Sequence, residues 1–379
     1  MMASLASTPA LAVPFLDLKP MNAAVKDDVL AAASELIDRN EFGSGAAVQA
    51  FEDEFAAYCE SAHAVGLASG LDALRLALLA LGIGRGDEVI VPANTFVATF
   101  EAVSQTAARP VVVDVSGDDD NIDMVTVEAA VTKRTRAILP VHLYGQMADV
   151  VALEALASAR GLTLVEDACQ AHGARRDGIR AGSAGRAAAF SFYPAKNLGA
   201  MGDAGALVTD DPELAERVRA LREHGQRAKY RHDFEGFTSR LDALQAAVLS
   251  AKLPHLDRWN ESRQDAASTY LAELDGVGDL RFPPVARGSI PVWHLFVVRT
   301  ESRAQLQEFM SRRGIQTGRH YPELPHLSPA YRWLGHGIGS FPVAEAVSRD
   351  GLSLPLFPGM TGEQLETVIE AIKEFFARG

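Results

Sequence analysis

The sequence has only two cysteines, Cys59 and Cys169, among its 379 residues. Two thiols cannot supply the disulfide framework of a small secreted domain, so we expect a reducing, cytoplasmic environment. Long apolar runs are also missing, since no segment approaches the roughly 20 residues that a membrane-spanning helix needs. Residues 1–14 are apolar but lack the basic start of a signal peptide, and we interpret them as a tail.

Positive charge is in short supply, with 36 Lys and Arg against 49 Asp and Glu and a net charge of −13. This balance argues against nucleic acid as a partner, although a local site can still bind a small anion. The content of 48% hydrophobic and 22% charged residues is typical of a globular protein. The length suffices for one large domain and a smaller one.

Short apolar runs alternate with helical patterns through the first two thirds of the chain. The runs predict strands, and the intervening segments 70–81, 95–107, 126–132 and 149–160 predict helices. Strands joined by helices favour a largely parallel sheet covered on both faces, in a three-layer αβα domain. Such sheets bind ligands at the carboxyl ends of their strands. The predicted strands are 63–67, 88–92, 110–115, 137–141, 163–167, 187–192 and 204–209.

The remaining segments suggest a second, smaller α+β domain at the C-terminus. We expect residues 1–45 to form a tail and helix, 46–255 the large domain and 256–379 the small domain. Residues 225–238 are interpreted as a polar loop between helices. Further helices are predicted at 21–39, 48–58, 212–224, 241–253, 259–274 and 361–377, a strand at 293–299, and a helix that ends at Arg313 with Ser302 as its N-cap.

Lys196 lies in an unusual setting for a lysine, a glycine-rich turn that follows a predicted strand. Backbone in such a turn can be approached closely by a ligand, and a lysine there can lose its proton and attack a carbonyl. Taken alone, an ordinary turn lysine is the more common interpretation. Ser191, five residues earlier, offers a hydroxyl to a phosphate oxygen, or else bonds its own backbone.

Three more features follow other predicted strands. Gly70 and Leu71 begin a helix whose N–H groups and dipole favour a phosphate, although Ser69 also reads as a plain N-cap. Phe96 could stack on a planar ligand or belong to the core. Each feature is a weak signal when it is considered by itself.

Asp167 ends an apolar strand, where a carboxylate is costly unless it is paired. A pyridinium nitrogen is one suitable partner, and capping of the next turn is the alternative. Gln170 could then bond a neighbouring phenolic oxygen. Cys169 has no evident basic partner, and we interpret it as inert. Together, the strand-end features suggest a site for pyridoxal 5′-phosphate (PLP).

Four ordered stretches carry a resemblance to a known family: 84–92, 140–146, 166–174 and 191–199. The sequence resembles the DegT/DnrJ/EryC1/StrS sugar aminotransferases, which are fold-type I PLP enzymes. The resemblance implies that Lys196 holds the cofactor as a Schiff base and shuttles a proton, and that Asp167 pairs with the pyridine nitrogen. It further implies that Gln170 lies near the phenolate oxygen and Phe96 stacks on the ring. Ser191 and the backbone of Gly70 and Leu71 would hold the phosphate.

The resemblance also implies a homodimer with shared active sites, in which a loop of one chain reaches the site of the other. The sequence departs from the family pattern at Leu71, where threonine is common, and at Thr238, where asparagine is common. Lys196 argues against the relatives that carry histidine there and act as dehydratases. The residues implied at the substrate or in the reaching loop are Tyr193, Lys229, Tyr230, His232, Thr238, His320 and Tyr321.

The implied reaction is transfer of an amino group from L-glutamate to a nucleotide-linked ketosugar. Residues 69–74 and 230–232 most resemble the branch that acts on dTDP-linked 3-keto-6-deoxyhexoses. A 4-keto sugar is the alternative substrate, and a PLP-binding regulatory protein is the alternative of another class.

Overall fold

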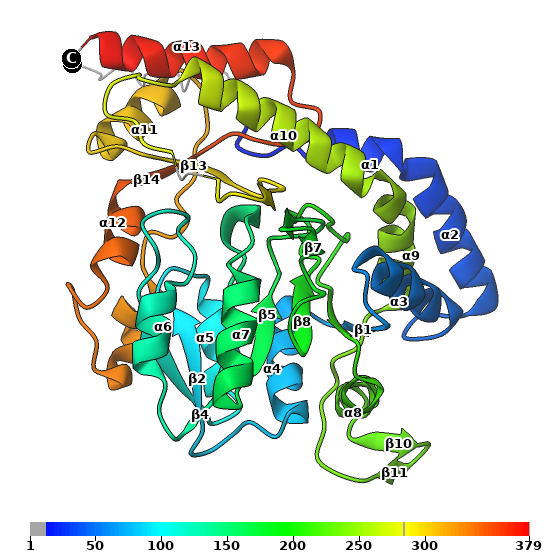
Figure 1. Ribbon diagram of the computed structural model, residues 1–379. Helices are drawn as coiled ribbons and strands as arrows, with labels where there is room; N and C mark the ends of the chain where they lie inside the picture. Colours follow the sequence, from blue (N-terminus) through cyan, green and yellow to red (C-terminus); the bar gives the residue numbers. More distant parts are fainter. Residues whose placement is uncertain (1–12, 283–284, 379) are drawn as a thin grey trace, which may run out of the picture.

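The structure is a computed structural model that describes residues 13–282 and 285–378 (Figure 1). The expected tail lies almost entirely outside these residues. A seven-stranded sheet forms the centre, in the order β1-β9-β8-β5-β4-β2-β3. Only β9 runs antiparallel to its neighbours, so the predicted mostly parallel sheet is confirmed. The strands are β1 (His63–Leu67), β2 (Glu88–Pro92), β3 (Arg109–Val113), β4 (Thr135–Ile138), β5 (Thr163–Asp167), β8 (Ala187–Ser191) and β9 (Gly205–Thr209).

Helices cover both faces of the sheet because successive strand residues point to opposite sides. In β2, Val89 and Val91 pack into one hydrophobic cluster with α4 (Gly70–Ala80) and α8 (Pro212–Arg222). Ile90 packs into another cluster, with side chains of two other helices. The three-layer prediction is therefore confirmed. The helices of the second face are α6 (Met124–Ala130) and α7 (Val150–Arg160), and α5 (Val97–Ser104) packs beside α4.

The N-terminal region corrects one prediction. The single helix expected at 21–39 is two helices, α1 (Lys19–Ala24) and α2 (Lys26–Arg39), which meet at the non-helical Val25. Leu30 of α2 is 58% exposed, so it lies outside the buried face of this helix. α3 (Ala46–Tyr58) and α9 (Ala243–Lys252) pack together behind β8.

The C-terminal region lies at the top of Figure 1. It contains α10 (Leu256–Glu273), α11 (Arg303–Arg312), α12 (Pro342–Asp350) and α13 (Gly362–Ala377), with a small antiparallel sheet. That sheet pairs β13 (Phe296–Arg299) with β14 (Gly351–Leu354), and the sequence analysis missed β14. Residues 324–344 pack onto the hydrophobic cluster of the central sheet that contains Val89 and Val91. They do not pack onto the hydrophobic core of the C-terminal region. The remaining short elements are η1 (Leu143–Gly145), β6 (Arg175–Arg176), β7 (Ile179–Arg180), η2 (Leu253–His255), β12 (Ser289–Ile290), η3 (Pro325–Leu327) and η4 (Pro329–Leu334).

The segment expected as a polar loop at 225–238 contains a β-hairpin, which is a further correction. Its strands are β10 (Gln226–Ala228) and β11 (Arg231–His232). In Figure 1 this hairpin projects beyond α8, at the opposite end of the molecule from α13. The described residues include no helix that is long and apolar enough to cross a bilayer.

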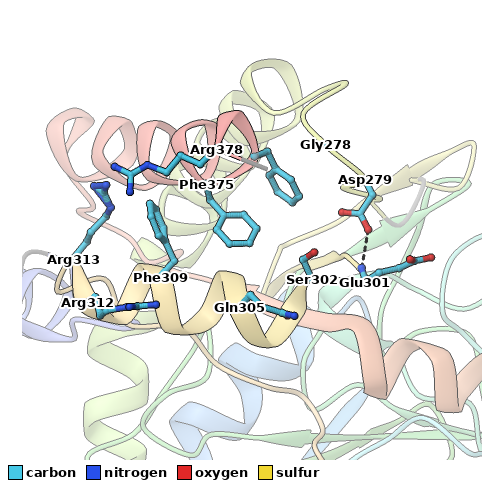
Figure 2. A pocket seen from close by; sticks show the side chains of 11 residues that line it. Gly278, Asp279, Glu301, Ser302, Gln305, Phe309, Arg312, Arg313, Phe375 and Arg378 are labelled. Carbon is cyan, nitrogen blue, oxygen red and sulfur yellow. Dashed lines mark hydrogen bonds between the residues drawn. The ribbon is translucent and has the colours of Figure 1, made fainter.

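A groove of about 990 Å³ lies between α11 and α13, on the outer face of the C-terminal region (Figure 2). Phe309 and Phe375 form its apolar wall, with ring centroids 5.5 Å apart. Arg313 and Arg378 lie beside these rings, and both pair with Glu374. The lining residues of the groove do not include Gly70, Asp167, Ser191 or Lys196, the candidate site residues that follow the predicted strands. We therefore expect the active site elsewhere.

Candidate active site

Asp167 and Ser191 end the adjacent strands β5 and β8, which pair in parallel with Asp167 opposite Ala189. Parallel pairing brings both side chains to the same edge of the sheet. α4 begins at this edge, because a Cβ atom added to Gly70 would lie 2.8 Å from the Cβ of Ser191 and 2.6 Å from the Sγ of Cys169. We call Gly70, Asp167, Gln170, Ser191 and Lys196 the strand-end cluster.

The start of α4 has the features of a phosphate cradle. The N–H of Asp72 donates to Ser69 Oγ at 3.1 Å, which confirms Ser69 as the N-cap. The N–H groups of Gly70 and Leu71 belong to the first turn, where no carbonyl of the helix can accept from them. The close approach of Ser191 leaves room only for glycine at position 70. An anion can therefore meet these two N–H groups beside the Ser191 hydroxyl.

Asp167 is buried and its two carboxylate oxygens have different partners. Oδ1 accepts from the backbone N–H of Cys169 at 3.2 Å, as the capping interpretation expected. Oδ2 accepts from the Thr99 hydroxyl at 2.8 Å. Each carboxylate oxygen can accept more than one hydrogen bond, so Asp167 keeps acceptor capacity for a ring nitrogen.

Gln170 links the sheet edge to the C-terminal region. Its Oε1 accepts from the Tyr144 N–H at 2.7 Å, and its amide nitrogen donates to the Tyr321 hydroxyl at 2.9 Å. The second amide N–H can still donate to a phenolic oxygen. Phe96 lies 5.5 Å from Tyr321 between ring centroids and is 53% exposed, so it is not a core phenylalanine.

Lys196 is partly buried, and its backbone N–H donates to the carbonyl of Tyr193 at 2.8 Å. Burial lowers the pKa of its amine, while Cys169 and Asp167 oppose the shift. Burial, and then the charge of Lys196, lowers the pKa of His172 to about 3 and of His320 to about 4. Neutral imidazoles therefore surround an amine that loses its proton more easily than an exposed lysine does.

Cys169 lies against the same edge without the features of a nucleophile. Burial raises the pKa of its thiol, and the charge of Asp167 raises it further. A buried protonated thiol is a poor nucleophile, which agrees with its interpretation as an inert residue.

Sequence reasoning missed several buried polar residues around the site. Glu166 accepts from His142 Nε2 at 2.8 Å and from the N–H groups of Gly182, Ala184 and Gly185. Burial opposes ionisation of Glu166, but these donors outweigh it and lower the pKa of the carboxyl. The network fixes the strand that ends in Asp167. The sequence signal for this network was the pair of adjacent carboxylates, Glu166 and Asp167, at the end of an apolar strand.

The residues implied in the reaching loop do not join the cluster within one chain. Lys229, Tyr230, His232 and Thr238 are exposed. The hydroxyl of Thr238 lies 3.1 Å from His224 Nε2, and His232 Nδ1 lies 2.9 Å from the His224 carbonyl oxygen. The neighbouring Ser239 is buried and donates to Asp72 on the first turn of α4.

His320 and Tyr321 approach the cluster from the C-terminal region, whereas Tyr193 is 56% exposed at its rim. His320 Nδ1 lies 2.8 Å from Ser353 Oγ, and its carbonyl accepts from the Tyr144 hydroxyl. The structure thus brings residues that are as much as 151 positions apart in the chain to one sheet edge. A lysine with a lowered amine pKa, a buried carboxylate and the first turn of α4 lie together there.

The family model for the "DegT/DnrJ/EryC1/StrS aminotransferase family" matches residues 24–373. The chain belongs to this family. Over 377 residues it is 52% identical to the dTDP-3-amino-3,4,6-trideoxy-alpha-D-glucose transaminase of Streptomyces venezuelae, covering 100% of this chain and 99% of that one. It is 51% identical to the erythromycin biosynthesis sensory transduction protein EryC1 of Saccharopolyspora erythraea, covering 95% and 99%.

Solved structures agree with this family assignment. The crystal structure of S. venezuelae DesV in complex with a ketimine intermediate has a TM-score of 0.95 and 52% identity, over 97% of this chain and 99% of that one. The structure of NtdA from Bacillus subtilis with bound cofactor PMP has a TM-score of 0.90 and 32% identity, over 98% and 86%. The protein is a PLP-dependent sugar aminotransferase of fold type I.

The strand-end cluster fits PLP in its chemistry. The cradle at Gly70 and Ser191 suits a phosphate, and Lys196 suits an aldehyde. Asp167 retains acceptor capacity for the N–H of a pyridinium ring, and Phe96 presents an exposed aromatic face.

Proposed function

We propose that this aminotransferase moves an amino group from L-glutamate to C3 of a dTDP-linked 3-keto-6-deoxyhexose. The observation that carries the proposal is the placement of Lys196, with its lowered amine pKa, at the sheet edge that also holds Asp167 and Gly70. The similarity over the whole chain to a transaminase named for a dTDP-3-amino sugar supports the choice of substrate.

Each residue of the strand-end cluster receives a role in this proposal. When bound, PLP supplies an electron sink that stabilises negative charge on the substrate carbon. Lys196 in its neutral form accepts and returns the proton at that carbon. Asp167 holds the ring N–H, and Ser191 with the first turn of α4 holds the phosphate. Gln170 and Tyr321, joined by a hydrogen bond, position the ring edge and the C-terminal region together.

Amination at C3 is supported by further relatives. A transaminase named for dTDP-3-amino-3,6-dideoxy-alpha-D-galactopyranose from Aneurinibacillus thermoaerophilus is 43% identical over 96% of this chain. The test is incubation with 3-keto and 4-keto sugar nucleotides and glutamate, followed by NMR of the product. We expect the amine at C3, and an amine at C4 would overturn the choice of sugar while leaving transamination intact.

A PLP-binding regulator is the second candidate function, favoured by the names of two relatives. One is EryC1, and the other is a pleiotropic regulatory protein of Geobacillus stearothermophilus that is 45% identical over 96% of this chain. Addition of glutamate to the PLP form decides between the functions. Conversion of the visible spectrum to that of the pyridoxamine form supports transfer, whereas a spectrum unchanged by any amino acid supports the regulator.

The assembly that we propose is a homodimer with shared active sites. The hairpin and Thr238 would reach the partner's phosphate and substrate, since the hairpin projects from the body of its own chain and Thr238 is exposed. We also propose residues 46–255 as the large domain and 256–379 as the small domain. A separate hydrophobic cluster, formed by Val13 and residues of the range 267–372, supports this division.

A further inference from the structure

Two buried threonines lie behind Asp167, and the proposed function assigns no role to either of them. The Thr99 hydroxyl donates to Asp167 Oδ2 at 2.8 Å, and the hydroxyl oxygens of Thr95 and Thr99 are 2.7 Å apart. Both threonines are 1% exposed. We call Thr95 and Thr99 the threonine pair.

The chemistry of the groups fixes the direction of these hydrogen bonds. An ionised carboxylate only accepts, and a threonine hydroxyl has a single proton to donate. Thr99 donates that proton to Asp167, so Thr95 must donate to Thr99. The chain of donors therefore runs from Thr95 through Thr99 and ends on the carboxylate. A hydroxyl that donates onward while it accepts is polarised, which strengthens the bond to the charged group.

We propose that Thr99, supported by Thr95, is a positioning residue that holds the Asp167 carboxylate where it can meet the pyridine nitrogen of PLP. The bond from Thr99 to Oδ2 and the bond from the Cys169 N–H to Oδ1 together fix the orientation of this carboxylate. An ionised carboxylate keeps the pyridine ring protonated, and the protonated ring is the better electron sink. The inference concerns cofactor binding and does not depend on which sugar is the substrate.

The threonine pair also couples Asp167 to Phe96. Phe96 lies in the sequence between the two threonines, at the start of α5. The N–H of Thr99 donates to the Phe96 carbonyl at 3.2 Å, so one helical turn carries both the exposed ring and the hydroxyl. A shift of this turn would move the stacking face and the partner of Asp167 together. The same turn would therefore position both the aromatic face that stacks on the ring and the residue that supports Asp167.

A purely structural role is the competing explanation, since both threonines are buried at a helix start. Thr99→Val keeps the shape and removes the hydroxyl, whereas Thr99→Ser keeps the hydroxyl and removes a methyl group. Thr106→Val is a matched control. Thr106 is buried just beyond the other end of α5, and its hydroxyl donates to the Val103 carbonyl at 2.8 Å.

The experiment measures two properties of PLP binding that require neither sugar nor glutamate. The first is the dissociation constant of PLP, from fluorescence titration of the apoprotein. The second is the pH at which the visible absorption of the bound cofactor titrates. Thr99→Val should weaken PLP binding about tenfold, the scale of one hydrogen bond to a charged group. In Thr99→Val, the midpoint of the absorbance titration should move to higher pH. A less protonated ring would withdraw less electron density from the nitrogen that would join it to Lys196, so that this nitrogen would keep its proton to a higher pH.

Thr95→Val should cause a smaller change of the same sign, and Thr99→Ser should match the unaltered protein in both properties. The proposal is overturned if Thr99→Val leaves both values unchanged, or if Thr99→Ser or Thr106→Val shifts them as far as Thr99→Val does. Failure of the sugar assay alone would instead count against the proposed function, since neither measurement uses sugar or glutamate.

Discussion

The strand-end cluster and the hairpin at 226–232 are both rich in polar groups, but they use them in opposite ways. In the cluster, Asp167 and Gln170 are buried and each makes two hydrogen bonds with the protein. In the hairpin, Tyr230 and His232 are exposed, and their hydrogen bonds go to Gln226 and His224 nearby.

This difference shows which part of the site one chain completes. Buried polar groups must find partners inside the protein, so the cluster is organised before any ligand arrives. Exposed polar groups can bond to water instead. The polar groups of the hairpin are therefore satisfied even when no second chain is bound, and the folded chain is not destabilised. We therefore expect changes in the cluster to act within one chain and, in the proposed homodimer, changes beside the hairpin to act across the interface.

The largest effect is expected from Lys196→Ala, which removes the group that we propose holds the cofactor and moves the proton. Transamination should fall by at least about 10³-fold. Borohydride reduction followed by mass spectrometry of the peptide should show a cofactor adduct in the unaltered protein and none in the variant. Lys373→Ala, an exposed lysine paired with Glu273, is the control. A variant that still gave the reducible adduct would falsify the role of Lys196.

A large effect is also expected from Thr238→Asp, which would place a negative charge near the phosphate of PLP. Repulsion between like charges should weaken PLP binding by about 10²-fold. Thr238→Asn is the matched neutral control and should bind PLP about as well as the unaltered protein. Equal affinities of the Asp and Asn variants would show that Thr238 does not face the phosphate.

Mixed dimers test whether Thr238 acts across the interface. Lys196→Ala chains and Thr238→Asp chains, unfolded and refolded together in equal amounts, should form heterodimers as about half of all dimers. The assay uses a PLP concentration that loads the unaltered protein but is too low to load the Thr238→Asp protein, so that neither variant is active alone. If Thr238 serves the partner's site, each heterodimer has one intact site, and activity should return to about a quarter of normal. If Thr238 serves its own chain, no site is intact and no activity returns.

A medium effect is expected in the pH dependence of stability, through His172. Burial, followed by the charge of Lys196, lowers the pKa of His172 to about 3 in the folded protein. Unfolded chains bind the proton near pH 6.5, whereas the folded protein does not. The free energy of unfolding should therefore fall between about pH 6.5 and 3, by about 1.4 kcal/mol per pH unit from this residue.

His172→Leu should remove this contribution and flatten the curve measured by urea unfolding at several pH values. The imidazole lies between the rings of Phe190 and Phe192, with centroids 5.3 and 5.7 Å away, so an apolar side chain suits the site. A variant with the same pH slope as the unaltered protein would contradict the assignment.

The smallest effect is expected from Leu71→Thr, which restores the side chain that the family commonly has at this position. A hydroxyl beside the phosphate should tighten PLP binding about threefold, partly offset by the loss of apolar contact with the core cluster beside α4. Leu71→Val has the same shape without the hydroxyl and should not tighten binding. Equal affinities of the two variants would show that only the backbone N–H of residue 71 serves the phosphate.

Local features of the site were predictable because short segments encode them. The bounds of β1, β2 and β5 agree with the predicted strands, since each is a short apolar run whose end is marked by polar or small residues. Ser69 was correctly assigned as the N-cap of α4. The partners of Asp167 and Gln170 were not predictable, because Thr99 is 68 residues and Tyr321 is 151 residues away in the chain.

The sequence by itself determined the parallel sheet and the chemical groups that follow its strands, because hydrophobic periodicity and helix capping act over a few residues. Only the tertiary structure decided that β5 lies between β4 and β8, that the start of α5 lies behind Asp167, and that residues 226–232 form a projecting hairpin. Strand order and the partners of buried hydrogen bonds depend on contacts between residues that are far apart in the sequence. No local pattern specifies those contacts, and they emerge only when the whole core packs.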